Sequence, residues 1–357
     1  MIKNFTSQKR LLLGSLIIIV IGTLLFFSSQ KGGTTTFSKP TELLTDEGSG
    51  LEAGNMPNQP HPLSIAALKK GTYHGSPIVI EETLSSGSNY NRYVTSYMSE
   101  GLKIFALMTI PRGNAPEGGW PAIIFNHGYI SPDVYRTTEK YVAYQDAFAR
   151  AGYVTFKSDY RGHGNSEGEA AGGYGSNDYT IDVLNAVSSV KQYEGVNPEK
   201  IGMWGHSMGG HITLESMVIN KDVKAGVIWA GVVGSYKDIF DRWRRRNPNQ
   251  STPTPGGRGS WRLELAKAYG EPEENPEFWA SLSATTYLKD ISGPIQLHHG
   301  TADSSVDVEL STGLYQLLTD SGMEVELFTY EGDDHNLSKN LRMALNRSVN
   351  FFDLYLK

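Results

Sequence analysis

The chain has 357 residues, a formal net charge of −6 and 39% hydrophobic residues. These values exclude a wholly disordered chain and give no basic surface for nucleic acid, so no nucleic-acid partner is expected. The absence of cysteine excludes disulfides, thiolate metal sites and a cysteine nucleophile.

The N-terminal segment carries a signal for the membrane. Residues 11–27 form an uncharged apolar run that reaches the lower limit of length for crossing a hydrocarbon core. Three basic residues precede this run: Lys3, Lys9 and Arg10. Because positive charge favours the cytoplasmic side, we predict a cytoplasmic N-terminus (residues 1–10) and an uncleaved single-pass transmembrane anchor (residues 11–30). The domain that follows is expected on the extracytoplasmic side, at the cell surface or in the periplasm. The alternative is a signal peptide cleaved near residues 28–30.

Residues 31–60 are rich in Gly, Thr, Ser and Pro and poor in large apolar residues, which predicts a flexible stalk. A folded domain is expected over residues 61–357. Within it, short β-rich runs alternate with longer segments of helical period, which is typical of an α/β fold with a mostly parallel sheet and helices on both faces. Eight strands are expected, at residues 93–98, 102–110, 122–126, 153–159, 200–205, 225–229, 295–299 and 325–330. Helices are expected at residues 139–151, 180–193, 209–219, 309–321 and 338–356.

Residues 235–285 interrupt this alternation. They contain Trp243, Trp261 and Trp279 and an arginine-rich segment at residues 242–246. An insertion of this length in a compact domain is usually functional, and its aromatic residues predict a folded helical cap. We interpret the arginines as a solvated helix face rather than as a clamp for substrate.

The segment Gly205-His206-Ser207-Met208-Gly209 lies between a strand-like run and a helical segment. A nucleophile elbow needs small residues two positions before and two after the serine, because the strained turn leaves no space for a Cβ there. Gly205 and Gly209 meet this requirement. The turn exposes the Ser207 hydroxyl and directs the first helical amides toward it, which makes the Met208 N–H an expected oxyanion donor.

A serine hydroxyl is a weak nucleophile unless a base takes its proton and a carboxylate orients that base. Asp303 and His335 follow Ser207 in this order, each just beyond an expected strand, and sites of this kind form at the carboxyl ends of parallel strands. We predict Ser207 as nucleophile, His335 as base and Asp303 as the orienting acid. Asp333 and Asp334 are second choices for the acid, since neighbouring side chains on a loop rarely reach the far nitrogen of an imidazole in line.

The second oxyanion donor is expected in the loop after the third strand, in Asn126-His127-Gly128-Tyr129. It is the Tyr129 backbone N–H or the Tyr129 phenol. Other histidines are interpreted as structural or turn residues: His163, His206, His211, His298 and His299.

Five segments, taken in order, form a specific set: FNHGY (125–129), DYRGHGNSEG (159–168), IGMWGHSMGG (201–210), LHHGTADSSV (297–306) and YEGDDHNL (330–337). This set resembles the catalytic domain of the prolyl oligopeptidase family, within the α/β-hydrolase superfamily, over about residues 90–357. The resemblance implies the α/β-hydrolase fold and a Ser207, Asp303, His335 triad. It also implies an oxyanion hole near Tyr129 and Met208, and neither a metal nor an organic cofactor.

Peptidases of this family usually carry an N-terminal β-propeller, and the residues between the stalk and the first expected strand are too few for blades of about 40 residues each. A stand-alone domain that acts on a small ester or a short peptide through an acyl-enzyme is therefore expected. The alternatives are a carboxylesterase for small acyl esters and a catalytically silent homologue that binds a ligand.

Overall fold

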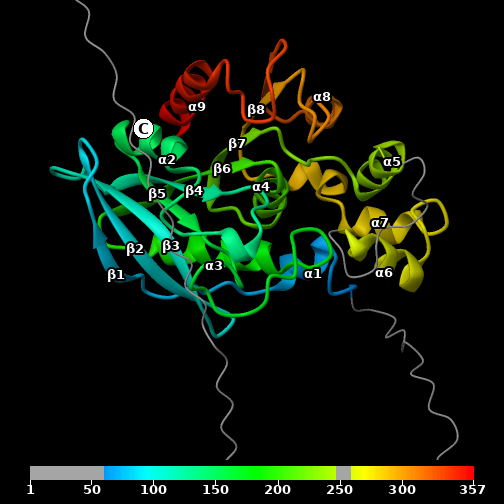
Figure 1. The fold of residues 1–357 in the computed structure, drawn as a ribbon, viewed down its shortest axis with the longest axis horizontal. Helices are drawn as coiled ribbons and strands as arrows, with labels where there is room; N and C mark the ends of the chain where they lie inside the picture. The colour runs from blue at the N-terminus through cyan, green and yellow to red at the C-terminus, as the bar shows by residue number, and fades with distance from the viewer. Residues whose placement is uncertain (1–59, 247–258) are drawn as a thin grey trace, which may run out of the picture. The chain divides into compact units, whose positions relative to one another are not determined.

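The computed structural model describes residues 60–246 and 259–357. In this part of the chain, nine strands form one sheet in the order β1-β2-β3-β5-β4-β6-β7-β8-β9 (Figure 1). The strands are β1 (Val79–Leu84), β2 (Tyr90–Ser99), β3 (Leu102–Pro111), β4 (Trp120–Asn126), β5 (Val154–Ser158), β6 (Val196–His206), β7 (Val223–Trp229), β8 (Ile295–Gly300) and β9 (Val325–Tyr330). The pairs β1–β2, β2–β3 and β3–β5 are antiparallel, and the other pairs are parallel. The fold class is confirmed as an α/β-hydrolase fold.

The expected number of eight strands is wrong, because β1 was missed. This strand lies at the edge of the sheet, pairs only with β2 and has a register shift between Ile80 and Glu82. Its side chains are exposed except for Leu84, which is partly exposed. A strand whose two faces are both solvated shows no alternation of apolar and polar residues, so its sequence gives no periodic signal.

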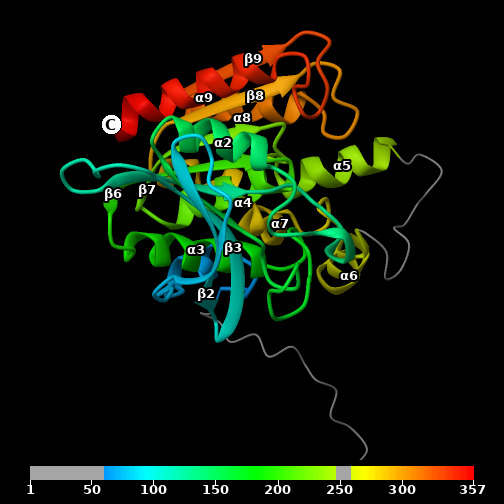
Figure 2. The same ribbon diagram turned by 60° about the vertical axis from the view of Figure 1, so that its left-hand side comes forward.

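Helices cover both faces of the sheet. The helices of this part of the chain, apart from those of the cap, are α1 (Ile65–Lys70), η1 (Pro132–Val134), α2 (Val142–Arg150), α3 (Asp178–Lys191), α4 (Met208–Ile219), α8 (Glu309–Asp320) and α9 (Leu341–Leu356). On one face, α2 and α9 bury Phe148 and Phe352 against the sheet. On the other face, α3, α4 and α8 bury Val183, Ile212 and Leu314. Figure 2 shows α2 and α9 on the side of the sheet opposite to α3.

The insertion between β7 and β8 contains α5 (Tyr236–Arg246), α6 (Ser260–Tyr269) and α7 (Pro276–Leu282), followed by η2 (Ala284–Asp290). Its apolar side chains form a small core of their own: Tyr236, Phe240, Leu265, Trp279 and Leu282. Figure 1 shows these three helices together at one side of the sheet. The helical cap expected from the aromatic residues is therefore present in the described part of the insertion.

The expected cytoplasmic N-terminus, anchor and stalk lie outside the described residues, apart from residue 60. In the ranges that the structure describes, no helix is both long enough and apolar enough to cross a membrane. The anchor thus stays a prediction.

Candidate active site

Ser207 lies on the turn between β6 and α4. Its backbone has φ 58° and ψ −120°, a conformation that residues with a side chain rarely adopt. A Cβ at position 205 would lie 2.2 Å from the Gly209 carbonyl oxygen, and a Cβ at position 209 would lie 1.9 Å from the Asn126 carbonyl oxygen. Both distances are impossible for non-bonded atoms, so the turn requires glycine at both places.

Asp303 and His335 lie in the loops that follow β8 and β9. The His335 Nδ1 is 2.7 Å from Asp303 Oδ2, and the Asp303 side chain is completely buried. His299 Nε2 is 3.1 Å from the same carboxylate oxygen. The other oxygen, Oδ1, accepts backbone hydrogen bonds from Ser305 and Val306 at 2.7 and 2.9 Å. In these four contacts, the two carboxylate oxygens of Asp303 face nitrogen atoms.

These contacts decide the charge of Asp303. Burial alone would raise the pKa of the carboxyl group, but hydrogen bonds from His299, His335 and the Val306 backbone outweigh burial and hold the pKa below its usual value. The ionised carboxylate accepts a hydrogen bond from His335, so Nδ1 of that ring carries the proton. The imidazole then has its lone pair on Nε2, which is the form that a general base needs.

One cavity brings the expected residues together. It has a volume of about 680 Å³, and Tyr129, Ser207, Met208 and His335 all line it. Met208 is the first residue of α4, where backbone N–H groups have no acceptor within the helix. The cap contributes further wall residues, including the aromatic side chain of Trp261.

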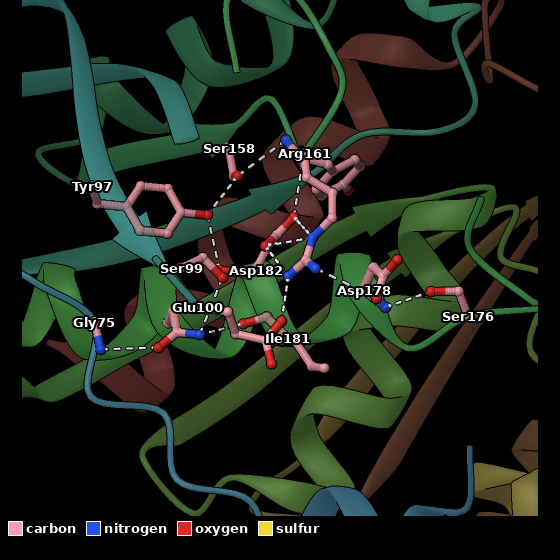
Figure 3. Close-up of polar contacts among 12 residues, drawn as sticks. Gly75, Tyr97, Ser99, Glu100, Ser158, Arg161, Ser176, Asp178, Ile181 and Asp182 are labelled. Atoms are coloured by element: carbon pink, nitrogen blue, oxygen red, sulfur yellow. Dashed lines mark hydrogen bonds and ion pairs between the residues drawn. The ribbon is translucent and has the colours of Figure 1, made fainter. Parts of the chain in front are cut away.

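The loop that carries Tyr129 contacts the loop after β5, in which Arg161 pairs with Asp182 of α3. Figure 3 shows this pair and the polar contacts around it. Arg161 Nε and Nη2 lie 3.1 and 2.8 Å from Asp182 Oδ1 on α3, and the Asp182 side chain is fully buried. Beside Arg161, the ring of Tyr160 stacks on His127 at 4.2 Å between centroids, and its hydroxyl donates to the His127 carbonyl oxygen at 3.1 Å. The buried ion pair thus fixes the loop after β5, and the Tyr160 ring fixes the loop after β4.

The second-choice acids have other partners. Asp333 accepts hydrogen bonds from the backbone N–H groups of Lys339 and Asn340, at 3.1 and 3.0 Å. Asp334 accepts from the N–H groups of residues 336 and 338, both at 3.0 Å. Both carboxylates therefore stabilise the turn before α9, and Asp303 is the carboxylate that bonds to the His335 ring.

Two histidines that the sequence indicates to be structural make hydrogen bonds to residues of the site. His299 donates to Asp303, and His206 Nε2 is 2.9 Å from the His335 carbonyl oxygen. His298, by contrast, bonds to Tyr330 within the sheet. The position of His299 four residues before Asp303 was the only sequence signal for its role, and it does not separate a partner of Asp303 from a core histidine.

The interpretation of the arginine-rich segment as a solvated helix face is wrong for one member. Arg245 is exposed, and Arg244 pairs with Glu271 at 2.9 Å on the cap surface. Arg242 instead lines the cavity, where its guanidinium pairs with Asp307 and lies 2.9 Å from Glu309. One face of α5 lies on the cavity, and helical spacing alone does not indicate which face that is.

Comparisons with known proteins match the chain to two family models. The model described as serine aminopeptidase, S33, matches residues 121–257, and the model of the prolyl oligopeptidase family matches residues 260–357. An uncharacterised peptidase of Bacillus subtilis is 24% identical over 330 residues, which are 88% of this chain and 46% of that protein. A probable dipeptidyl peptidase 4 of Aspergillus flavus is 23% identical over 316 residues, which are 85% of this chain and 34% of that protein. The chain thus spans less than half the length of these relatives.

Solved structures share the fold. An acylaminoacyl peptidase of Pyrococcus horikoshii has a TM-score of 0.58 at 22% identity, over 76% of this chain and 42% of that chain. An acetyl xylan esterase from Paenibacillus sp. R4 has a TM-score of 0.59 at 17% identity, over 82% of this chain and 92% of that chain. Together with the two family models, these likenesses show that the chain has the α/β-hydrolase fold and is similar to the catalytic domain of the prolyl oligopeptidase family.

Proposed function

We propose that the protein hydrolyses ester or peptide bonds of small substrates through an acyl-enzyme formed on Ser207. One observation carries the proposal. Ser207, on its strained turn, shares a cavity of about 680 Å³ with His335, whose Nδ1 lies 2.7 Å from the buried Asp303 carboxylate. A hydroxyl, an imidazole and an ionised carboxylate in this arrangement are the groups that acyl transfer needs.

In the proposed reaction, His335 Nε2 takes the proton of the Ser207 hydroxyl while Oγ attacks the substrate carbonyl carbon. The N–H groups of Met208 and Tyr129 bind the oxyanion of the tetrahedral intermediate, where each donor contributes about 10²- to 10³-fold in rate. His335 then gives the proton to the leaving alkoxide or amine. Water attacks the acyl-enzyme with His335 again as base, which releases the carboxylic acid and restores the Ser207 hydroxyl.

The cavity favours small substrates, because its volume is in the range of pockets that hold small molecules. The peptidase relatives support peptide substrates. A carboxylesterase is the second candidate, and one observation favours it: the acetyl xylan esterase aligns over 92% of its own chain, whereas the acylaminoacyl peptidase aligns over 42%.

The test compares an ester and an anilide that share one small acyl group, with Ser207→Ala as the blank. We expect the wild-type protein to turn over the ester whether it is a peptidase or a carboxylesterase, since an alkoxide leaves more easily than an amine. Anilide turnover within about a hundredfold of ester turnover would assign a peptidase, and ester turnover alone would assign a carboxylesterase. A folded protein that turns over neither substrate, and that a fluorophosphonate does not label at Ser207, would contradict the proposal and favour the silent homologue.

We also propose that residues 11–30 anchor the protein in a membrane, with the domain on the extracytoplasmic side. The uncharged run at residues 11–27 and the three basic residues before it support this placement. The full chain should stay in the membrane fraction of the cells that express it after an alkaline carbonate wash. Release of the full-length chain by that wash would contradict the anchor.

A further inference from the structure

His206, the residue before Ser207, makes a hydrogen bond with each nitrogen of its ring. Its Nε2 lies 2.9 Å from the His335 carbonyl oxygen, and its Nδ1 lies 2.7 Å from the Tyr141 hydroxyl. The Tyr141 oxygen also accepts the backbone N–H of Gly128 at 2.9 Å. A chain of three hydrogen bonds thus runs from the loop after β4 to the loop after β9 and passes beside Ser207.

The direction of every bond in this chain follows from its ends. A carbonyl oxygen can only accept, so His206 carries its proton on Nε2 and donates to His335. Nδ1 is then an acceptor, and Tyr141 must donate its hydroxyl hydrogen to it. The Tyr141 oxygen is left to accept from Gly128. Burial, together with the nearby His335 ring, lowers the pKa of His206 to about 4, so His206 stays neutral above that pH and the chain keeps one direction.

Packing leaves this chain little freedom. His206 is buried, and its ring lies 4.5 Å from the His335 ring between centroids. A Cβ at position 128 would lie 2.8 Å from the Tyr141 hydroxyl and 3.0 Å from the Ser207 Cβ, so the backbone of Gly128 fits closely between these two side chains. Movement of Tyr141 would therefore displace the loop that carries the expected oxyanion donor at Tyr129.

We propose that Tyr141 and His206 are positioning residues, which hold the Gly128 loop and the His335 backbone at a fixed separation across Ser207. The inference rests on the proposed function, because it gives these two residues a role in acyl transfer at Ser207. A misplacement of reacting groups by about 1 Å costs on the order of 10²-fold in rate, so loss of this chain should lower kcat while the substrate still binds.

The first test is Tyr141→Phe, which removes the hydroxyl and leaves two partners without it. We expect kcat for the ester to fall about 10- to 100-fold, with KM within about threefold of its original value. The matched control is Tyr144→Phe. Tyr144 lies in the first turn of α2, whose N-cap is Tyr141, and its ring is 5.4 Å from the Tyr141 ring, but it is outside the chain of hydrogen bonds. Its variant should keep kcat, and an equal kcat in the two variants would overturn the proposal.

The second test replaces His206 by residues that each keep one of its two hydrogen bonds. In His206→Gln the amide nitrogen reaches the place of Nε2 and still donates to His335. In His206→Asn the amide reaches only the place of Nδ1, so it keeps Tyr141 and loses His335. We expect Gln to retain more than tenfold the kcat of Asn at similar melting temperatures. Equal losses would mean that His206 only fills space, which would overturn its role.

A readout that does not depend on turnover separates this inference from the proposed function. In a ¹⁵N-histidine NMR spectrum at pH 6, His206 should carry its proton on Nε2, and its Nδ1 resonance should shift in Tyr141→Phe but not in Tyr144→Phe. An Nδ1-protonated His206 would overturn the hydrogen-bond chain. If the spectrum is as expected and the wild-type protein hydrolyses nothing, the proposed function fails, and the catalytic role assigned to the two residues fails with it.

Discussion

Ser207→Ala should lower kcat/KM for an activated ester by about 10⁶-fold, because it removes the atom that forms the acyl-enzyme while the base and the oxyanion donors stay in place. The fold should not change, since Ala keeps the Cβ of Ser207 and demands no new space. The measurement is ester hydrolysis together with fluorophosphonate labelling of the folded protein. A variant that kept full hydrolysis would show that Ser207 is not the nucleophile.

Ser207→Gly is the informative companion of this variant. The backbone of Ser207 has φ 58°, which costs about 1–3 kcal/mol for a residue with a side chain and much less for glycine. Ser207→Gly should therefore be as inactive as Ser207→Ala but more stable than the wild type by about 1 kcal/mol in urea unfolding. A Gly variant that is less stable than the Ala variant would contradict the view that the turn is strained in favour of function.

The elbow could be predicted from the sequence because its requirement falls on two residue types at a fixed spacing around Ser207. Gly205 and Gly209 stand within four residues of each other, and the short distances that a Cβ would meet there arise from the turn itself and from the neighbouring strand β4. The order of Asp303 and His335 could also be predicted, because each follows a strand of the same parallel sheet. In such a sheet the loops at the carboxyl ends of the strands lie at one edge, so their proximity can be predicted from the strand order alone.

Other parts of the site depend on contacts that no local pattern carries. Tyr141 and His206 are 65 positions apart, and the contact of His206 with His335 is made to the backbone carbonyl of His335 rather than to its ring. A backbone acceptor leaves no mark on residue type. Arg242 could not be assigned to the cavity for another reason. Its carboxylate partner Asp307 lies beyond β8, and sequence spacing could only describe the α5 surface as charged.

Asp303→Asn should lower kcat by about 10⁴-fold, and the structure gives a specific reason. The Oδ1 atom of Asp303 accepts two backbone N–H groups, from Ser305 and Val306. An asparagine must place its only acceptor oxygen there, so its NH₂ group takes the place of Oδ2 and faces His335 Nδ1. Nδ1 then has to accept, and the proton moves to Nε2, where His335 can no longer take a proton from Ser207.

Asp333→Asn is the matched control for this variant. Asp333 is also a buried carboxylate that accepts backbone N–H groups, and it lies two residues before His335, but its partners are at the start of α9. The control should lose stability and keep kcat within about threefold. A comparable loss of kcat in both variants would mean that any disturbance of this loop stops the reaction, and the specific role of Asp303 would have to be abandoned.

The pH dependence of the free energy of unfolding shows whether the Asp303 carboxylate stabilises the fold through its charge or through its packing. The pKa of this carboxyl group is lower in the folded protein than its unfolded value of about 4, so the ionised form stabilises the fold above about pH 4. This contribution is lost as the pH falls from about 4 through the lower, folded pKa. The deficit in the free energy of unfolding of Asp303→Asn, relative to the wild type, should therefore be constant from pH 7 to about pH 5 and shrink below about pH 4. Urea unfolding at pH 7, 5 and 3.5 measures it, and a deficit that grew at pH 3.5 would show that the Asp303 carboxylate does not stabilise the fold through its charge.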